Sequence, residues 1–286
     1  MKVTLPEKFK MKKKEIIIYG IIVFICIISL VVTFYVQFYG RVDFGKLLGI
    51  DQSENVFGSK TEEEIENIKL GFENLFDNKI TYSENVDNKK ADKEQEIVYT
   101  KYNNEESKTN SYELNVHIPY INIDNEIIDK YNEDIEDFQE KAEEVLKSEN
   151  GNVIYTVDYT ANIQNGILSL MIRSNLKEGT NAQREIIQTY NYDLRNNKEI
   201  SLEEILKIID VDSQTAQNKI DNEIKTQQER VDELKSLGYS IYSRDSENKI
   251  YDIKNIEQYY ITNDTLYVIF AYGNNANTSE KDVIII

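Results

Sequence analysis

The 286-residue chain has very few of the residues that form disulfides and the commonest catalytic sites. Cysteine and histidine each occur once, as Cys26 and His117, and tryptophan does not occur. A single cysteine cannot close an intramolecular disulfide, so the hydrophobic core must stabilise any exported domain. Gly-rich phosphate loops and zinc-ligand spacings are missing as well. The sequence therefore predicts no enzyme and no catalytic, cofactor-binding or metal-binding residues.

The lone histidine lies in a segment of strictly alternating polarity. Tyr112, Leu114, Val116 and Ile118 alternate with polar residues, which is typical of a half-buried strand. If these four side chains face the core, His117 faces the opposite, more solvated side. An ordinary surface histidine is therefore favoured over a general base at this position.

One long segment lacks charge altogether. Residues 16–36 read IIIYGIIVFICIISLVVTFYV, which is long enough to span a bilayer as a helix. Six lysines in residues 1–15 place the N-terminus in the cytoplasm by the positive-inside rule. We expect a cytoplasmic tail over 1–15, a membrane anchor over 16–38 and everything after it outside the cell. A cleaved signal peptide is the less favoured alternative, because its apolar region is shorter and ends in a small-residue cleavage site.

Acidic residues dominate the part that follows the apolar run. The chain has a formal charge of −18, and its first fifteen residues contribute six lysines and two glutamates, which leaves −22 for the rest. Such a charge disfavours nucleic acid and favours cationic partners. A simpler reading is that acidic residues keep an exported domain soluble. Richness in Ile, Asn, Lys, Glu and Tyr is typical of low-GC Gram-positive bacteria, where the outer side of the membrane faces the wall.

The remaining sequence predicts an α+β domain with a mostly antiparallel sheet. Residues 39–94 are expected to be a juxtamembrane linker containing a short helix, which begins with a capping box between Thr61 and Glu64. Residues 84–96 are polar and are expected to be a linker. The folded domain is expected over 95–286. Asn165-Gly166 predicts a hairpin between two long strands. Strands are predicted near 97–102, 112–118, 153–164, 167–175, 186–194, 258–261, 265–272 and 282–286, and helices near 125–146, 202–206 and 212–237. The first of these helices has an apolar stripe with a period near 3.6 and a heavily acidic back face.

Three stretches, in this order, resemble a known family. They are Tyr112–Pro119 followed by Tyr131-Asn132, Tyr190–Leu194 followed by Lys198–Leu206, and Tyr259–Phe270 followed by Tyr272 and Asp282–Ile286. This pattern resembles the extracytoplasmic domain of RsiV-type anti-sigma factors, which also accompanies the catalytic domain of PdaC-type peptidoglycan deacetylases. The resemblance divides the domain into halves of about 95–180 and 181–286.

The resemblance implies a wall-facing sensor or binding module whose ligand is a cationic protein such as lysozyme. The segment after Phe270 is then a candidate ligand rim, with Tyr272, Asn274 and Asn275 as its binding residues. Where the family's turn usually reads Gly-Lys, this chain has Asn197-Lys198, and asparagine tolerates the left-handed conformation.

Two further hypotheses stay open. The chain is a degenerate anti-sigma factor controlled by proteolysis, although a lysine-rich tail of fifteen residues is expected to be too short to wrap a sigma factor. Alternatively, it is a non-catalytic or weakly catalytic cell-wall accessory protein that uses its acidic residues, whose abundance makes no carboxylate pair informative.

Overall fold

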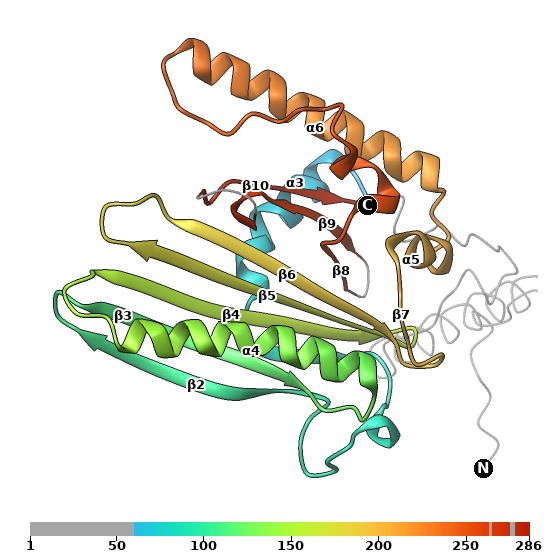
Figure 1. The fold of residues 1–286 in the computed structure, drawn as a ribbon. Helices are drawn as coiled ribbons and strands as arrows, with labels where there is room; N and C mark the ends of the chain where they lie inside the picture. The colour runs from blue at the N-terminus through green and yellow to red at the C-terminus, as the bar shows by residue number, and fades with distance from the viewer. Residues whose placement is uncertain (1–59, 263–264, 275–277) are drawn as a thin grey trace, which may run out of the picture. The chain divides into compact units, whose positions relative to one another are not determined.

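Two β-sheets and the helices around them form the part of the chain that the computed structural model describes, residues 60–262, 265–274 and 278–286 (Figure 1). The predicted α+β class, with mostly antiparallel strands, is confirmed. The expected tail and anchor lie outside the described residues. Within those residues, no helix combines the length and apolarity needed to cross a bilayer.

The larger sheet has the strand order β2-β3-β4-β5-β6-β7, and β1 lies beside β4. Its strands are β1 (Lys79–Tyr82), β2 (Val98–Lys108), β3 (Tyr112–Ile121), β4 (Val153–Gln164), β5 (Ile167–Glu178), β6 (Arg184–Asp193) and β7 (Lys198–Glu199). Most neighbours are antiparallel, whereas β3 and β1 both run parallel to β4. A parallel neighbour requires a crossover connection, and α4 (Glu126–Leu146) supplies it between β3 and β4.

Helix α4 packs against one face of this sheet. The Asn125 side chain caps it by accepting a hydrogen bond from the Ile127 N–H at 2.9 Å. Its inward residues recur every three or four positions, as the sequence predicts, and join side chains of β3, β4 and β5 in one core. These residues are Ile128, Tyr131, Ile135, Phe138, Ala142 and Val145.

The β4–β5 hairpin turns at Asn165-Gly166, which confirms the sequence prediction. Both residues have positive φ, 49° and 71°, as a two-residue hairpin turn of this kind requires. The Arg195 side chain packs so closely on Gly166 that a Cβ atom there would overlap it. Asn197 also has a positive φ, 51°, so asparagine does adopt the left-handed conformation in the turn before β7.

Pro119 lies inside β3, at a place where the strand pairs on one side only. β3 continues through it to Ile121, and Pro119 lies opposite Thr100 of β2. The register slips there because β2 carries one extra residue between Thr100 and Tyr102. Pairing of β3 with β4 ends at Val116, so proline lies beside a bulge and beyond the paired part of β4.

The short N-terminal helix docks on the domain. α3 (Glu62–Gly71) begins with the expected capping box between Thr61 and Glu64, and η2 (Phe72–Leu75) follows it. Phe72 is 2% exposed and packs with Met171 and Ile187, which lie on the face of the sheet opposite α4. Ile65 and Ile68 of α3 are partly buried against the same cluster, so the helix docks through its apolar side and η2 supplies the buried ring.

Residues 79–92 also pack on the fold, although residues 84–96 were expected to be a polar linker. β1 pairs in register with residues 160–163 of β4. A 3-10 turn, η3 (Asp87–Lys89), follows it, and the preceding Val86 is buried in the core beneath α4. The Asn122 side chain accepts a hydrogen bond from the Asp92 N–H at 2.8 Å. The polar composition did not indicate this packing, because the segment is held by backbone pairing of β1 and by one buried apolar side chain, Val86.

The smaller sheet has the antiparallel order β10-β9-β8, with β8 (Tyr259–Ile261), β9 (Leu266–Ala271) and β10 (Lys281–Ile285). α5 (Leu202–Ile208) and the long α6 (Ser213–Ser236) pack beside it, close to their predicted ranges. Short 3-10 turns, η4 (Lys249–Tyr251), η5 (Ile253–Asn255) and η6 (Tyr272–Asn274), complete the connections.

Side chains of the larger sheet form hydrogen bonds to the peptide groups of β8 on the edge that does not pair with β9. The Ile261 N–H donates to Ser169 Oγ at 3.2 Å, and Asn162 Nδ2 donates to the Ile261 carbonyl at 3.1 Å. Asn191 Nδ2 donates to the Tyr259 carbonyl at 2.9 Å. Since the two expected halves also share the β5–β6 hairpin, they are joined into one structure rather than two separate bodies.

Candidate binding sites

Of the three predicted ligand-rim residues, the structure describes the side chain of Tyr272. Tyr272 is only 2% exposed, and its hydroxyl donates a hydrogen bond to Asp282 Oδ2 at 2.5 Å. The Tyr272 hydroxyl is therefore engaged inside the protein rather than exposed on a rim. Asn274 ends η6, and Asn275 lies outside the described residues. The ligand role of these two asparagines stays a prediction.

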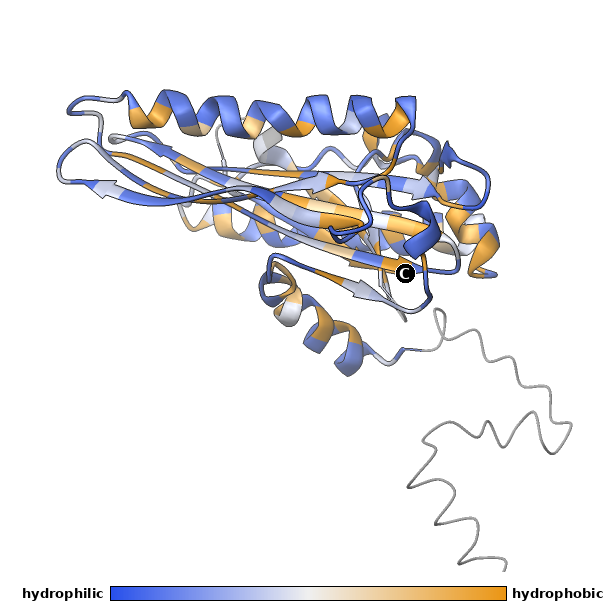
Figure 2. Cartoon of the chain, turned by 90° about the horizontal axis from the view of Figure 1, so that it is seen from below, coloured by the Kyte–Doolittle hydropathy of each residue, from blue (hydrophilic) through white to orange (hydrophobic). Residues whose placement is uncertain are grey.

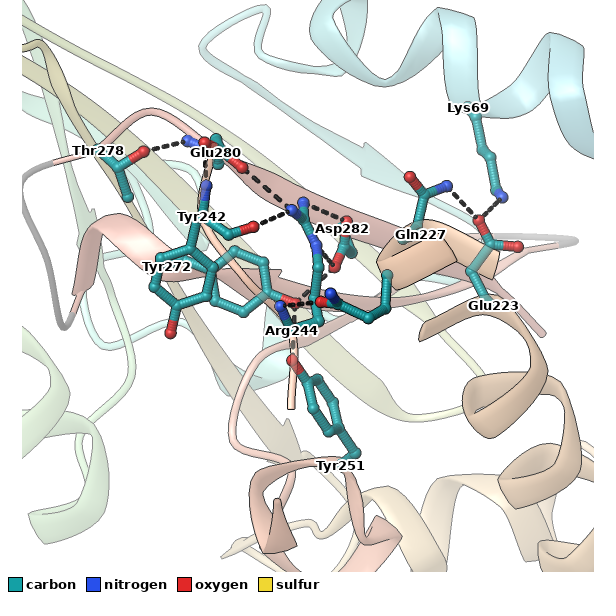
Figure 3. Close-up of polar contacts among 11 residues, drawn as sticks. Lys69, Glu223, Gln227, Tyr242, Arg244, Tyr251, Tyr272, Thr278, Glu280 and Asp282 are labelled. Atoms are coloured by element: carbon teal, nitrogen blue, oxygen red, sulfur yellow. Dashed lines mark hydrogen bonds and ion pairs between the residues drawn. The ribbon is translucent and has the colours of Figure 1, made fainter. Parts of the chain in front are cut away.

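Tyr272 belongs to a buried network centred on Arg244 (Figure 3). Arg244 Nε and Nη2 donate to the two oxygens of Asp282 at 3.0 and 2.9 Å, a bidentate pair. Its Nη1 donates to Glu280 Oε2 at 3.0 Å and to the Tyr242 carbonyl at 2.8 Å. Arg244 and Asp282 are 8% and 5% exposed, so the pair is almost fully removed from water.

Tyrosine rings and hydroxyls enclose this ion pair. The Tyr242 ring stacks on Tyr272 with centroids 4.4 Å apart, and the Tyr251 and Tyr272 hydroxyl oxygens are 3.0 Å apart. Because Tyr272 gives its only proton to Asp282, Tyr251 is the donor in that second contact. Burial together with the Asp282 charge raises the pKa of Tyr272 well above its ordinary value.

The protonated, charged form of Arg244 is favoured over the neutral form despite its burial. Burial lowers its pKa, but the hydrogen bonds and charge of Asp282 outweigh that effect and raise the pKa above its usual value. The charged groups of Arg244 and Asp282 are paired inside the protein, so the network joins the segment after α6 to β10 as a structural element. An aspartate in the apolar stretch Asp282–Ile286 was the sequence signal for a buried cation, although nothing identified Arg244 as its partner.

His117 lies at a junction of polar groups on the sheet face opposite α4. Its Nδ1 is 3.2 Å from Asp158 Oδ1 of β4, without the geometry of a hydrogen bond, and its side chain is 28% exposed. Asn78 Nδ2 donates to the same Asp158 oxygen at 2.9 Å. Arg173 Nη2 lies 3.9 Å from the other Asp158 oxygen. The histidine is half-buried beside a carboxylate that other groups already engage, and no catalytic role is assigned to it.

The outer side of α4 carries the largest concentration of charge on a single described helix. Nine carboxylates and two lysines give the helix a net charge of −7 over about 30 Å. We call these nine residues the α4 acidic face: Glu126, Asp129, Glu133, Asp134, Glu136, Asp137, Glu140, Glu143 and Glu144. All nine are exposed, and Figure 2 shows α4 along one side of the sheet with much of its length hydrophilic.

Few of these charges are compensated. Among the described residues, ion pairs engage only Glu136, with Lys101 at 3.1 Å, and Glu144, with Lys141 at 3.2 Å. By contrast α6, of similar length, carries five carboxylates and four basic residues. The helical spacing predicts the acidic back of this helix, but the spacing alone does not indicate a binding surface.

No other constellation in the described residues suggests chemistry. Within them, no group of three or more histidine, cysteine, aspartate and glutamate side chains is arranged to hold a metal ion. The α4 acidic face is therefore the strongest candidate binding surface that the geometry provides.

Comparison with known proteins gives only distant matches. No protein-family model and no curated protein matches the chain. Among solved structures, a DUF3298 family protein from Pseudomonas aeruginosa matches with 13% identity and a TM-score of 0.39, over 63% of this chain and 83% of that one. A DUF3298 family member from Bacteroides fragilis matches with 13% identity and a TM-score of 0.34, over 61% of this chain and 80% of that one. Neither description names a ligand, so what this chain binds must follow from its own surfaces.

Proposed function

We propose that this chain is a non-catalytic, membrane-anchored binding or sensor protein that presents an RsiV-like domain outside the cell. Its ligand is a cationic envelope protein, with lysozyme as the first candidate. The lysine-flanked apolar run over 16–36 supports the anchor and its orientation. The three stretches that resemble RsiV-type domains support the sensor role. The observation that carries the proposal is the α4 acidic face.

Repulsion within the α4 acidic face destabilises the helix, which supports a role for the face in binding. Four pairs of acids lie four residues apart, Asp129/Glu133, Glu133/Asp137, Glu136/Glu140 and Glu140/Glu144. Each like-charge pair destabilises a helix by about 0.2–0.5 kcal/mol. Glu143 and Glu144 also lie at the negative end of the helix dipole, and the last turn contains no basic residue. A cationic partner relieves this repulsion, whereas solubility requires only that charge be spread over the surface.

Binding of hen lysozyme to the full-length protein, measured by calorimetry over a range of salt concentrations, tests the proposal. We expect the triple variant Glu133→Lys, Asp137→Lys, Glu140→Lys to lose binding. The matched control, Glu229→Lys, Asp232→Lys, Glu233→Lys, changes the net charge equally on α6 and should retain most of it. Affinity should fall steeply as salt rises, because exposed charges are screened.

The same variants separate a binding role from a structural one. The triple variant turns the pairs 129/133, 136/140 and 140/144 into opposite-charge pairs, whereas 133/137 and 137/141 become pairs of like charge. Like-charge pairs four residues apart thus fall from four to two, so the helix should become slightly more stable while the affinity falls. Equal losses for the α4 and α6 variants would show that only net charge matters. No binding of lysozyme at low salt would refute lysozyme as the ligand.

A further inference from the structure

The free edge of the smaller sheet lies between two helices. β10 is the last strand of that sheet, and α3 and α6 lie on either side of it (Figures 1 and 3). The Tyr272 N–H donates to the Glu280 carbonyl at 3.1 Å, and the Ile286 N–H donates to the Leu266 carbonyl at 2.9 Å. The register between β9 and β10 is unbroken from residue 281 to 285. Even-numbered residues of β10 therefore bond to β9.

The odd-numbered residues of β10 direct their peptide groups away from β9, because antiparallel ladders alternate. The N–H and C=O groups of Lys281 and Val283 consequently face the space between the helices. In the described ranges, no hydrogen bond from another element reaches the peptide groups of Val283. This edge is a template for one more strand.

A hollow of about 470 Å³ lies over this edge. Lys69 and Phe72 of the α3 side, Thr226 and Arg230 of α6, and Val283 of β10 are among its lining residues. Proteins commonly cover a sheet edge with a helix, but here two helices flank the edge and leave space over it. The volume is within the range of ligand-binding clefts, about 300–1,000 Å³.

Most charged side chains around the hollow already form ion pairs within the protein. Lys69 Nζ bonds Glu223 Oε1 at 2.7 Å, which links α3 to α6, and Lys281 Nζ lies 2.8 Å from Glu73 Oε1. Glu66 on α3 and Arg230 on α6 are exposed, and neither has an ion-pair partner within the described part of the chain. A carboxylate on α3 and a guanidinium on α6, neither in an ion pair within the described residues, thus line the hollow.

We propose that this hollow binds an extended peptide segment of a partner protein, which adds to β10 as a further strand. Its peptide groups bond to the outward N–H and C=O groups of Lys281 and Val283. A basic side chain of the peptide meets Glu66, and an acidic one meets Arg230. Strand addition gives affinity through main-chain hydrogen bonds and specificity through flanking side chains. The site is distinct from the α4 acidic face, which lies on the other face of the larger sheet.

Hydrogen exchange resolved to single amides tests the premise in the full-length protein alone. The Val283 amide should exchange at least about tenfold faster than the amides of Asp282 and Ile284, which bond to β9. Equal protection of all three amides would overturn the proposal, because the edge would then already be occupied.

Selection of peptides from a phage-displayed random dodecapeptide library on the full-length protein tests the site itself. Val283→Pro removes the outward N–H and leaves the ladder to β9 intact, so selected peptides should bind about tenfold more weakly. Val283→Ala keeps that N–H and should bind within about threefold of the parent protein.

Two further variants test the proposal even if Val283→Pro fails to fold. Thr226→Trp fills the hollow from α6 without touching β10 and should block binding even if the proline variant unfolds. The triple lysine variant of α4 should leave peptide binding unchanged, which separates this site from the proposed lysozyme site. No enriched peptides, or equal binding by Val283→Pro, Thr226→Trp and the parent protein, would overturn the proposal.

Discussion

The buried ion pair between Arg244 and Asp282 predicts a large and specific loss of stability. Asp282→Asn keeps the shape of the side chain and removes the charge that balances Arg244. The pair is almost fully buried, and both Arg244 and the Tyr272 hydroxyl lose a charged acceptor. Leaving one buried charge without its partner costs about 3–5 kcal/mol. Glu280 still accepts from Arg244, so we expect the lower end, about 3 kcal/mol.

Urea unfolding followed by circular dichroism measures this loss, which is a substantial share of the about 5–15 kcal/mol of a typical domain. The matched control is Glu136→Gln, which breaks the exposed pair with Lys101 and should cost at most about 1 kcal/mol. In a double-mutant cycle, Arg244→Met with Asp282→Leu should recover most of the loss, since neither charge then remains buried.

A loss below about 1 kcal/mol for Asp282→Asn would refute this reasoning, because the pair would then be solvated or unnecessary. Failure of the double variant to recover stability would show that packing around the tyrosines, rather than charge balance, stabilises this part of the fold.

Three other changes test separate parts of the structure. Phe72→Ala should lower the free energy of unfolding by about 3–5 kcal/mol in urea, because the ring is buried against the two sheets; a loss below about 1 kcal/mol would mean that η2 is not docked. Gly166→Ala should lower the melting temperature, since its φ of 71° and the Arg195 side chain leave no place for Cβ; an unchanged melting temperature would contradict the turn geometry. The buried Asp193 carboxylate has a lowered pKa because, although burial raises it, hydrogen bonds from the turn at Asn196 outweigh that effect. Its stabilisation is present above about pH 4, the unfolded pKa, and disappears as pH falls through the lower folded pKa. Asp193→Asn should therefore be less stable than the parent at neutral pH, with a gap that narrows in acid; a gap independent of pH in unfolding curves would argue against this linkage.

Local patterns in the sequence predicted most elements correctly. The alternation from Tyr112 to Ile118, the helical spacing from Ile128 to Val145 and the turn at Asn165-Gly166 each depend on neighbouring residues alone. The capping box at Thr61 was likewise correct, because its hydrogen bonds join residues three apart. The acidic back of α4 was also visible, since helical periodicity separates its two faces.

Long-range pairing decided what these patterns left out. The polar residues 79–92 belong to the fold because β1 finds an edge of β4, a partner about eighty residues away. Tyr272 was expected at a binding rim, but an arginine twenty-eight residues earlier and an aspartate ten residues later enclose it. No local property of Arg244 indicates a buried ion pair.

The sequence by itself determined the α+β class, the hairpins, the helix caps and the excess of acidic charge, because each depends on composition or on residues within a few positions. Tertiary structure alone decided which edges remain free and which charges are buried. Burial and edge pairing are properties of distant segments brought together, so the hollow beside β10 and the Arg244 network emerge only when the chain is folded.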